Sequence, residues 1–352
     1  MKGPGNAGKT AVFALTERGL ALSGKIACAL ESVEIFEPSR LVKGGLKKEA
    51  SRAFWRFDAL VFISAVGIAI RCVAPLLKGK HLDPAIVAVD ERGRFVISLL
   101  SGHMGGANRL AESVAKAINA TPVITTATDI WNLPSVEDLA EGFSLVIEDP
   151  KKIKAVNSAI LNSEKVFVID ASKTRRDEIT ERFKGVFTCL RTLPKRLGPK
   201  EACVLVSSRI ESVHPAFVER TLVLRPREII AGVGCGKGVP KALIKKALFE
   251  AFTAAGLSML SIKKFATIDI KKNERGLKAL ASELGAPIEV YGPEELNRVK
   301  YPSQPSRLVM KATGAYAVAE PAALISSGAK KLCLKKTKIG HVTIAAALLP
   351  SR

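Results

Sequence analysis

The sequence predicts an α/β protein of several domains, with open, mostly parallel sheets flanked by helices and a separate C-terminal α/β domain. Short apolar segments alternate with amphipathic segments along nearly the whole chain, which is the pattern of parallel strands joined by helical crossovers. The 352 residues are too many for one ordinary core. We expect a flexible tail over residues 1–10, an N-terminal domain over 11–134, a middle linker domain over 135–226 and a C-terminal domain over 227–352.

The composition is that of a globular protein, because 47% of the residues are apolar and 25% are charged. No apolar run approaches the roughly 18 residues that a membrane span needs, and the N-terminus lacks the pattern of a signal peptide, so we expect a cytoplasmic protein without membrane contact. The six cysteines form no C-x-x-C pair. We expect no metal site and no structural disulfide, with Cys235 left open as a reactive thiol.

A formal net charge of +21 favours polyanionic partners such as nucleic acid, phosphates or a substrate with many carboxylates. Residues 228–352 hold 20 Lys and Arg against 9 Asp and Glu, a surplus of 11. Nucleic-acid binding normally brings aromatic stacking platforms or a basic reading helix, whereas aromatic residues are 5% of this chain and its basic residues are dispersed. We therefore expect no nucleic-acid partner; a basic proteome background stays open as the other explanation of the charge.

The first strand is predicted at residues 11–15, directly after a stretch, GPGNAGKT, that fits the written pattern of a phosphate-binding P-loop. A working P-loop follows a strand and opens a helix, but only two residues precede this match and an apolar strand follows it. We interpret it as part of the tail. The remaining elements of the first domain are strands at 59–66, 85–90, 95–100 and 122–126, and helices at 19–31 and 107–118.

Residues 81–95 predict a β-hairpin whose turn is DERG, so Asp90 is expected to be a turn residue and not a catalytic acid. The middle domain carries predicted strands at 165–170, 202–207 and 221–225 among charged segments such as 173–184, with no motif that points to chemistry. The C-terminal domain opens with a strand near residue 228, continues into a helix, and ends with KLCLKK at 331–336 and VTIAAALL at 342–349.

SGHMGGAN is the densest motif of the chain, because a strand runs into Ser101, Gly102, His103, Gly105 and Gly106 and a helix starts near residue 107. The glycines let the backbone approach a ligand and place N–H groups at a helix N-terminus, which favours an anionic group. Ligands of open α/β sheets bind at the carboxyl ends of strands, where we expect this loop. His103 suits general acid or base chemistry there, and a turn-capping role stays open.

Two other segments of the first domain carry polar groups at strand ends. Ser64 and Gly67 follow a predicted strand, and Arg71 lies one helical turn further on, within reach of a carboxylate held at that turn. Downstream, Thr125, Thr126, Thr128 and Asp129 end a strand. This run either caps a helix or binds substrate.

The C-terminal domain repeats the strand, glycine loop and helix pattern at Gly232, Gly234, Cys235, Gly236, Lys237 and Gly238. Lys237 stands where a dinucleotide-binding loop needs its third glycine, and no acidic residue lies near the twentieth following position, so we reject NAD. The loop can still hold a carboxylate or phosphate against Lys237. Further on, Gly314 precedes a helix with Glu320 in its first turns; Glu320 is either a general acid or base with a raised pKa or a partner of the helix dipole.

These segments together resemble the cobalt-precorrin 5A hydrolase family of anaerobic cobalamin biosynthesis. The resemblance is carried by GIAIRCVAPLLKGKHLDPAIVAVDERGRFVISLLSGHMGGANRLA and PVITTATD in the first domain and by GVGCGKG, IDIKKNERGLKALASELG and the run from VAEPAAL to KTKIGHVTIAAALL in the last. It spans most of residues 50–132 and 228–347, and the middle domain matches weakly. The family usually has basic residues directly after the loop cysteine, where this chain has Gly236 and then Lys237.

The resemblance implies hydrolytic opening of the ring-A δ-lactone of cobalt-precorrin-5A with release of acetaldehyde. It implies no cofactor of the enzyme's own, since the cobalt arrives chelated in the substrate. The implied partner is the cobalt-tetrapyrrole itself, with neighbouring enzymes of the pathway and the oligomeric state left open. Non-catalytic classes also stay open: a tetrapyrrole-binding or delivery protein of the same pathway, and, from the charge alone, a nucleic-acid-binding α/β protein.

Chemistry then suggests roles for individual residues in the lactone reaction. His103 would activate water, Gly105 and Gly106 would stabilise the oxyanion, and Glu320 or His103 would assist the later C–C cleavage. Arg71, Lys237 and Lys311 would hold peripheral carboxylates. The complete expected substrate-binding set is Ser64, Gly67, Arg71, Ser101, Gly102, Gly105, Gly106, Asn108, Thr125, Thr126, Asp129, Gly232, Gly234, Cys235, Lys237, Lys311 and Gly314.

Overall fold

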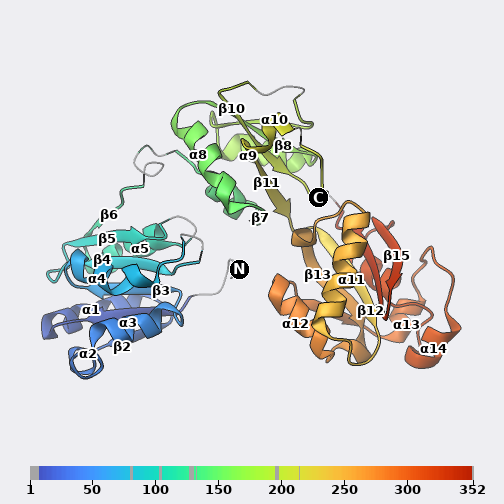
Figure 1. Cartoon of the computed structure of the whole chain (residues 1–352), viewed down its shortest axis with the longest axis horizontal. Helices are drawn as coiled ribbons and strands as arrows, with labels where there is room; N and C mark the ends of the chain where they lie inside the picture. Colours follow the sequence, from blue (N-terminus) through green and yellow to red (C-terminus); the bar gives the residue numbers. More distant parts are fainter. Residues whose placement is uncertain are drawn as a thin grey trace. The chain divides into compact units, whose positions relative to one another are not determined.

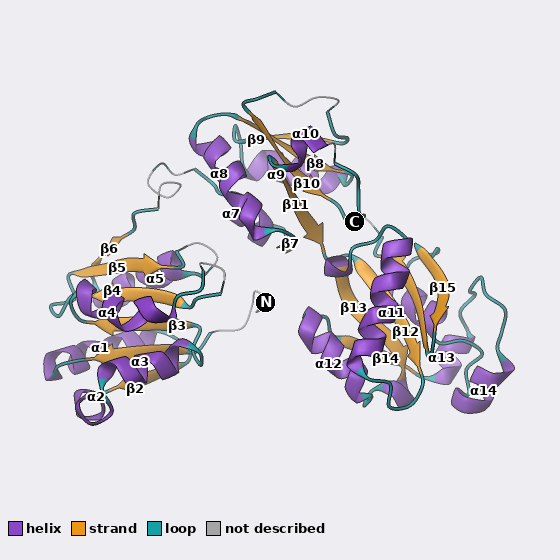
Figure 2. Ribbon diagram, in the orientation of Figure 1, coloured by secondary structure: helices purple, strands orange, loops and turns teal. Residues whose placement is uncertain are grey.

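Three sheets flanked by helices make up the α/β architecture that the sequence predicts (Figures 1 and 2). The structure is a computed structural model, and it describes residues 8–79, 82–102, 105–126, 131, 133–194, 198–213 and 215–350. The chain divides into two compact units, the first ending at Glu137 and the second beginning at Asp138. Each unit is described by itself.

The first unit is built on one sheet, whose six described strands have the order β2-β1-β3-β4-β5-β6. The first four strands in the chain run parallel. The strands are β1 (Thr10–Ala14), β2 (Val33–Phe36), β3 (Ala59–Ile63), β4 (Ala85–Val89), β5 (Phe95–Leu100) and β6 (Thr121–Val123). The helices of the unit are α1 (Glu17–Ala29), α2 (Pro38–Gly44), α3 (Leu46–Phe54), α4 (Val66–Val73), the 3-10 helix η1 (Ala74–Leu76) and α5 (Ala107–Ile118), with α7 (Val136–Gly142) beginning at the division.

The central strands of this sheet are buried on both faces, which explains their unbroken apolar sequences. All residues of β1, β3 and β4 are buried. Parallel strands covered by helices on both sides have this composition. Phe13 lies between Phe36 and Phe62, with ring centroids 4.6 and 4.7 Å away, so aromatic stacking adds to the burial across three neighbouring strands.

The hairpin predicted within residues 81–95 is confirmed, because β4 and β5 pair antiparallel. The carboxylate of Asp90 accepts hydrogen bonds from the backbone N–H groups of Arg94 and Phe95, both at 2.7 Å, so Asp90 is a turn residue as expected. The reversal of direction also fixes the position of the loop after β5. Ile86, near the start of β4, pairs with Leu100, at the end of β5, so this loop lies at the edge where β4 begins.

Some predicted boundaries in this unit were wrong. The strand expected over 59–66 ends at Ile63, because the chain turns there and α4 begins at Val66. The strand expected over 122–126 is β6, but it begins at Thr121 and ends earlier than expected, at Val123. A strand, β1, directly follows Lys9, so the GPGNAGKT stretch opens no helix and cannot be a P-loop. Residues 1–7 of the expected tail lie outside the described residues.

The second unit starts with a sheet of order β7-β11-β10-β8-β9, counting the described strands. The charged segment 173–184 forms α9, whose first turn is capped by the hydroxyl of Ser172. The strands are β7 (Leu145–Ile147), β8 (Lys165–Asp170), β9 (Phe187–Leu190), β10 (Glu201–Val206) and β11 (Thr221–Pro226). The helices are the 3-10 helix η2 (Pro150–Lys152), α8 (Ile153–Leu161), α9 (Lys173–Arg182) and α10 (Pro215–Val218).

The last part of the chain forms a third sheet, of order β14-β13-β12-β16-β15, in which β12, β13 and β14 run parallel and β16 and β15 antiparallel. Its strands are β12 (Ile229–Cys235), β13 (Ile262–Ile268), β14 (Ile288–Tyr291), β15 (Leu334–Ile339) and β16 (Val342–Leu348). Its helices are α11 (Lys241–Ala254), η3 (Met259–Ser261), η4 (Asp269–Lys271), α12 (Arg275–Leu284), α13 (Pro293–Asn297), α14 (Arg307–Thr313) and α15 (Ala319–Ser327).

No helix among the described residues is long and apolar enough to cross a membrane. All six cysteines are free thiols, and burial raises the pKa of Cys203 to about 12.

Candidate functional site

The loop after β5 is a tight turn held by its own backbone and by one neighbouring segment. Ser101 has a φ of +60°, a left-handed conformation that a non-glycine residue rarely adopts, and it is 9% exposed. Its hydroxyl donates to the carbonyl of Asp83 (3.1 Å). A Cβ on Gly105 would lie 2.2 Å from the Cβ of Ser101, so this position requires glycine. Gly106, at φ +83°, directly precedes α5.

Asn108 joins three segments around this turn. It is 7% exposed, its Oδ1 accepts from the hydroxyl of Ser98 on β5 (2.7 Å), and its Nδ2 donates to Oγ1 of Thr126 beyond β6 (3.2 Å). Its backbone N–H bonds the carbonyl of Gly102 (3.0 Å). Asn108 therefore acts as a buried connector, and it brings Thr126 to the same edge of the sheet as Ser101.

Asp83 supports the turn from a segment that the sequence did not single out. It is 9% exposed, and its carboxylate accepts the backbone N–H groups of Lys78 (3.0 and 3.3 Å) and Gly79 (3.0 Å). Its carbonyl is the acceptor for Ser101. The loop that enters β4 and the loop that leaves β5 are thus joined at one residue. The sequence shows only an aspartate before a proline at this position; its burial, and hence its need for hydrogen-bond donors, is visible only in the structure.

Ser64, Gly67 and Arg71 do not belong to this edge. Ser64 follows Ile63, which pairs with Val89 at the far end of β4, whereas Ser101 follows Leu100, which pairs with Ile86 at its start. The two ends of a five-residue strand are about 13 Å apart. Ser64 and Ser101, both predicted to bind substrate, therefore lie at opposite ends of β4, because the hairpin reverses β5.

Arg71 lies on α4, one helical turn after Gly67. Its Nη1 atom donates to the carbonyl of Gly67 (3.2 Å), so the guanidinium lies back over the turn at the start of α4. The side chain is exposed and can meet a carboxylate at that turn. His103 and Asp129, which the sequence also assigns to the site, lie outside the described residues. Thr125 is exposed beside Thr126.

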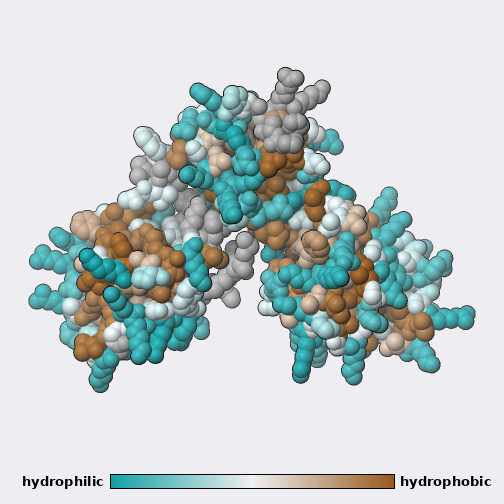
Figure 3. Space-filling view, viewed as in Figure 1, coloured by the Kyte–Doolittle hydropathy of each residue, from teal (hydrophilic) through white to brown (hydrophobic). Residues whose placement is uncertain are grey.

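Large apolar side chains are exposed on and after α4. They belong to Ile68 (37% exposed), Ile70 (44%), Leu77 (40%) and Leu82 (74%). Figure 3 shows hydrophobic residues gathered on one face of this unit. The apolar side chains and exposed Arg71 give this unit both apolar and cationic contact groups.

The second glycine loop, over residues 234–240, leaves β12 at the carboxyl edge of the third sheet. Gly236 donates its N–H to the carbonyl of His341 (3.1 Å), and Gly238, at φ +73°, donates to Oε2 of Glu274 (3.0 Å). Lys237 is exposed. Burial raises the pKa of the half-buried Cys235 thiol, while nearby Lys271 opposes the shift, so this cysteine lacks the low pKa of an activated nucleophile.

Gly232 has a packing function that cannot be recognised from its position in the glycine-rich motif. A Cβ at this position would lie 1.9 Å from the carbonyl oxygen of Ala319 and 3.0 Å from the Cβ of Ala323. The residue is buried, and the start of α15 packs directly on its backbone. We therefore correct its expected contact with substrate: Gly232 allows α15 to approach β12, and no space for a ligand lies above it.

Gly314 and Lys311 lie further along this part. Gly314 has a φ of +74° and ends α14, and its carbonyl accepts from Nδ2 of Asn297 (2.9 Å). A Cβ there would lie 3.3 Å from Pro293, which directly follows Gly292 after β14. Gly314 therefore lies beside the turn at the carboxyl end of β14. Lys311 is exposed in the last turn of α14.

Glu320 is 1% exposed in the first turn of α15. Its Oε2 accepts from the backbone N–H of Ser303 (3.3 Å) and its Oε1 from that of Lys336 (3.0 Å), at an irregularity in β15. The carboxylate thus anchors two segments to the helix start. This geometry matches the helix-terminus alternative that the sequence left open, and a catalytic function for Glu320 stays an untested prediction.

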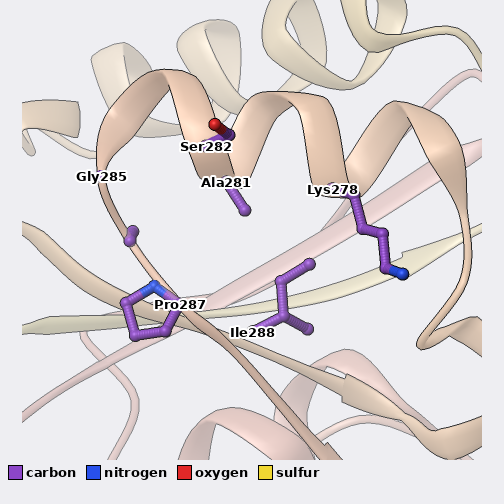
Figure 4. Close-up of a pocket in the computed structure, with 7 residues that line it drawn as sticks. Lys278, Ala281, Ser282, Gly285, Pro287 and Ile288 are labelled. Carbon is purple, nitrogen blue, oxygen red and sulfur yellow. The ribbon is translucent and has the colours of Figure 1, made fainter.

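An open depression of about 320 Å³ lies on α12 and the segment that enters β14 (Figure 4). Lys278, Ala281 and Ser282 come from the helix, and Pro287 and Ile288 come from the strand side. Because these residues precede β14, the depression is at the opposite edge of the sheet from residues 234–240. It is not part of the candidate site.

Three protein-family models match the chain in succession. They are described as Cobalamin synthesis G N-terminal (residues 49–129), Cobalamin biosynthesis central region (134–226) and Cobalamin synthesis G C-terminus (229–347). The first spans the loop after β5 and the third spans the loop after β12.

Two curated relatives match over almost their whole length. A cobalt-precorrin-5A hydrolase of Priestia megaterium is 33% identical over 360 residues, covering 97% of this chain and 96% of its own. A cobalt-precorrin-5A hydrolase of Salmonella typhimurium is 35% identical over 328 residues, covering 90% and 92%. A solved cobalamin biosynthesis protein G homologue from Sulfolobus solfataricus is 24% identical with 97% of each chain covered and a TM-score of 0.37.

Proposed function

The chain belongs to the cobalamin synthesis G family, and from this premise we propose that it is a cobalt-precorrin-5A hydrolase of cobalamin biosynthesis. The observation that carries the proposal is 33% identity to such an enzyme over 97% of the chain. The names of the relatives favour an enzyme over a carrier that binds the macrocycle without changing it.

The proposed reaction consumes one water molecule and releases one acetaldehyde. Water adds to the lactone carbonyl, the acyl C–O bond breaks, and a ring-A carboxylate and a carbinol hydroxyl result. Loss of the hydroxyl proton then breaks the adjacent C–C bond: acetaldehyde leaves, and the electron pair stays on the macrocycle, which takes up a proton. The cobalt is carried by the substrate, and we propose no further cofactor.

The loop after β5 supplies groups suited to the first step. We assign His103 as the base that takes a proton from water, and the backbone N–H groups of Gly105 and Gly106 as donors to the oxyanion. What supports the assignment is the geometry of the described residues on either side: Ser101 has a positive φ and bonds Asp83, Asn108 is buried and bonded to Ser98, and position 105 requires glycine. A preorganised donor set stabilises developing charge without reorganisation.

The carboxylate side chains around the macrocycle are expected to bind cationic side chains, and the faces of the macrocycle are expected to pack against apolar side chains. Each unit is considered by itself. In the first unit, we propose that exposed Arg71 binds a peripheral carboxylate and that the exposed apolar side chains near α4 meet a face of the ring. In the second unit, exposed Lys237 and Lys311 are the groups that we propose for carboxylates. The chain's net charge of +21 favours the approach of a polyanion.

The direct test is incubation of the purified protein with cobalt-precorrin-5A, followed by mass spectrometry of the macrocycle and an enzymatic acetaldehyde assay. We expect equal amounts of opened product and acetaldehyde. His103→Gln should lower kcat by about 10²- to 10⁴-fold, the usual contribution of a general base, and leave binding of the macrocycle, followed by its absorbance, within about twofold. His214→Gln, at a histidine in the central region of the sequence and outside both glycine loops, serves as the matched control. Binding without product would support the carrier, and unchanged turnover by His103→Gln would remove the histidine from the mechanism.

A further inference from the structure

The loop over residues 234–240 is pressed against the start of α12 without intervening side chains. A Cβ on Gly276 would lie 2.2 Å from the carbonyl oxygen of Val239 and 3.0 Å from the backbone nitrogen of Lys241. The backbone of the loop and the first turn of the helix are therefore in direct contact. Figures 1 and 2 show α11 and α12 as neighbours beside β12 and β13.

Glu274, the residue before α12, bonds this loop directly. Its Oε2 accepts the backbone N–H of Gly238 (3.0 Å), and its Oε1 accepts from Nζ of Lys271 (2.9 Å). Gly238 has a φ of +73°, so the bond fixes the residue at which the loop turns. The side chains of Lys271 and Glu274 are 13% and 12% exposed, which makes the pair less screened than an ordinary surface ion pair.

The other charged and titratable groups near Glu274 are Lys237 of the loop and the Cys235 thiol. Lys237 is exposed and Cys235 is half-buried. With Glu274 bonded to Gly238 and Lys271, the loop keeps a defined backbone while Lys237 stays at the surface. A substrate carboxylate then meets an ordered loop and one exposed ammonium group.

We propose that Glu274 is the positioning residue of the second glycine loop: it holds residues 234–240 in the conformation that binds a peripheral carboxylate of the macrocycle, and Lys271 neutralises it in that position. This inference rests on the proposed function for the identity of the ligand. Glu274 touches no reacting atom and is not assigned a catalytic role.

The neighbouring turn of the same sheet offers a matched control. Glu295 accepts the backbone N–H of Gly292 (2.7 Å) at the turn after β14, so it makes the same kind of bond in another loop. Both bonds join a carboxylate to a glycine N–H after a parallel strand. Glu274→Gln and Glu295→Gln therefore remove one charge each and disturb different loops.

The experiment measures amide hydrogen exchange by mass spectrometry in the full chain, together with steady-state kinetics on cobalt-precorrin-5A. For Glu274→Gln we expect exchange in peptides over 234–240 to become at least about tenfold faster, KM to rise by about three- to tenfold, and kcat to stay within about twofold. Glu295→Gln should speed exchange over 290–297 and leave both the 234–240 loop and KM unchanged. Glu274→Asp, which keeps the charge on a shorter side chain, should fall between wild type and Glu274→Gln in both readouts.

Unchanged exchange over 234–240 in Glu274→Gln would overturn the inference. Faster exchange with an unchanged KM would leave Glu274 as the residue that orders the loop, and would overturn the carboxylate-binding role that we propose for the loop. A fall in kcat alone would also contradict the inference, because it would place Glu274 in the chemistry.

Discussion

Single residues of a motif can have opposite functions, as Gly232 and Gly238 show. Both lie in one glycine-rich segment, but Gly232 is buried beneath α15 and Gly238 adopts a left-handed conformation at the surface. Motif spacing alone places them together. The difference arises because the side-chain position of Gly232 is occupied by the carbonyl of Ala319, which comes from a segment more than 80 residues later.

Gly232→Ala tests this packing function. The new Cβ would overlap the carbonyl oxygen of Ala319, at 1.9 Å, and backbone cannot move aside as a flexible side chain can. We expect a loss of about 3 kcal/mol or more in the free energy of unfolding, measured by urea denaturation. Gly24→Ala, inside α1 with nothing within 4 Å of the new Cβ, should instead be neutral or stabilise by up to about 1 kcal/mol. Equal midpoints for wild type and Gly232→Ala would contradict the packing interpretation.

At the scale of elements, the hairpin β4–β5 determines which residues can share a site. Because β5 runs against β4, the SGHMGGAN loop lies at the edge where β4 begins, and Ser64 lies at the other edge. The hairpin itself is predictable from DERG between two apolar runs. Following its reversal would have separated these two groups of residues from the sequence alone.

The start of α5 depends on Asn108, which links the helix to Ser98 and Thr126. Asn108→Ala would leave both hydroxyls without this partner, and we expect a loss of about 1–3 kcal/mol in the free energy of unfolding together with a higher KM. Asn119→Gly, at the other end of α5 where φ is +57°, should keep or slightly raise stability, because glycine adopts this conformation more easily. Urea denaturation and steady-state kinetics measure the two effects. A stable Asn108→Ala with wild-type KM would show that the loop is held by its backbone alone.

The whole molecule is strongly basic, with a formal net charge of +21, and several described carboxylates form ion pairs with lysine. Lys241 and Lys245 hold the pKa of Glu283 at about 2, and Lys271 followed by the N–H of Gly238 lowers the pKa of Glu274. A carboxylate with a lowered folded-state pKa contributes stability that is fully present above its unfolded pKa of about 4.5 and is lost as the pH falls through its folded pKa.

For the protein as a whole, we therefore expect these carboxylates to leave the free energy of unfolding nearly unchanged between pH 7 and about pH 5.5, and to lower it progressively from about pH 4.5 toward pH 2. Glu283→Gln should reduce this acid-side slope. In the wild type, 0.5 M salt should also reduce it, because the Glu283 pairs are at the surface. Urea denaturation at a series of pH values provides the measurement. An identical slope in wild type and Glu283→Gln would show that these pairs do not contribute.

The sequence by itself determined the α/β class, the β4–β5 hairpin, the two glycine loops and the family, because each depends on residues close together in the chain. Only the tertiary structure decided which edge each loop occupies, that Gly232 is a packing residue, and that Glu274 bonds Gly238. These contacts join segments tens of residues apart, and they exist only once parallel strands such as β12 and β13 have paired. Hydrophobic periodicity specifies that a strand forms, whereas its neighbours and direction are set by how all the buried faces pack together.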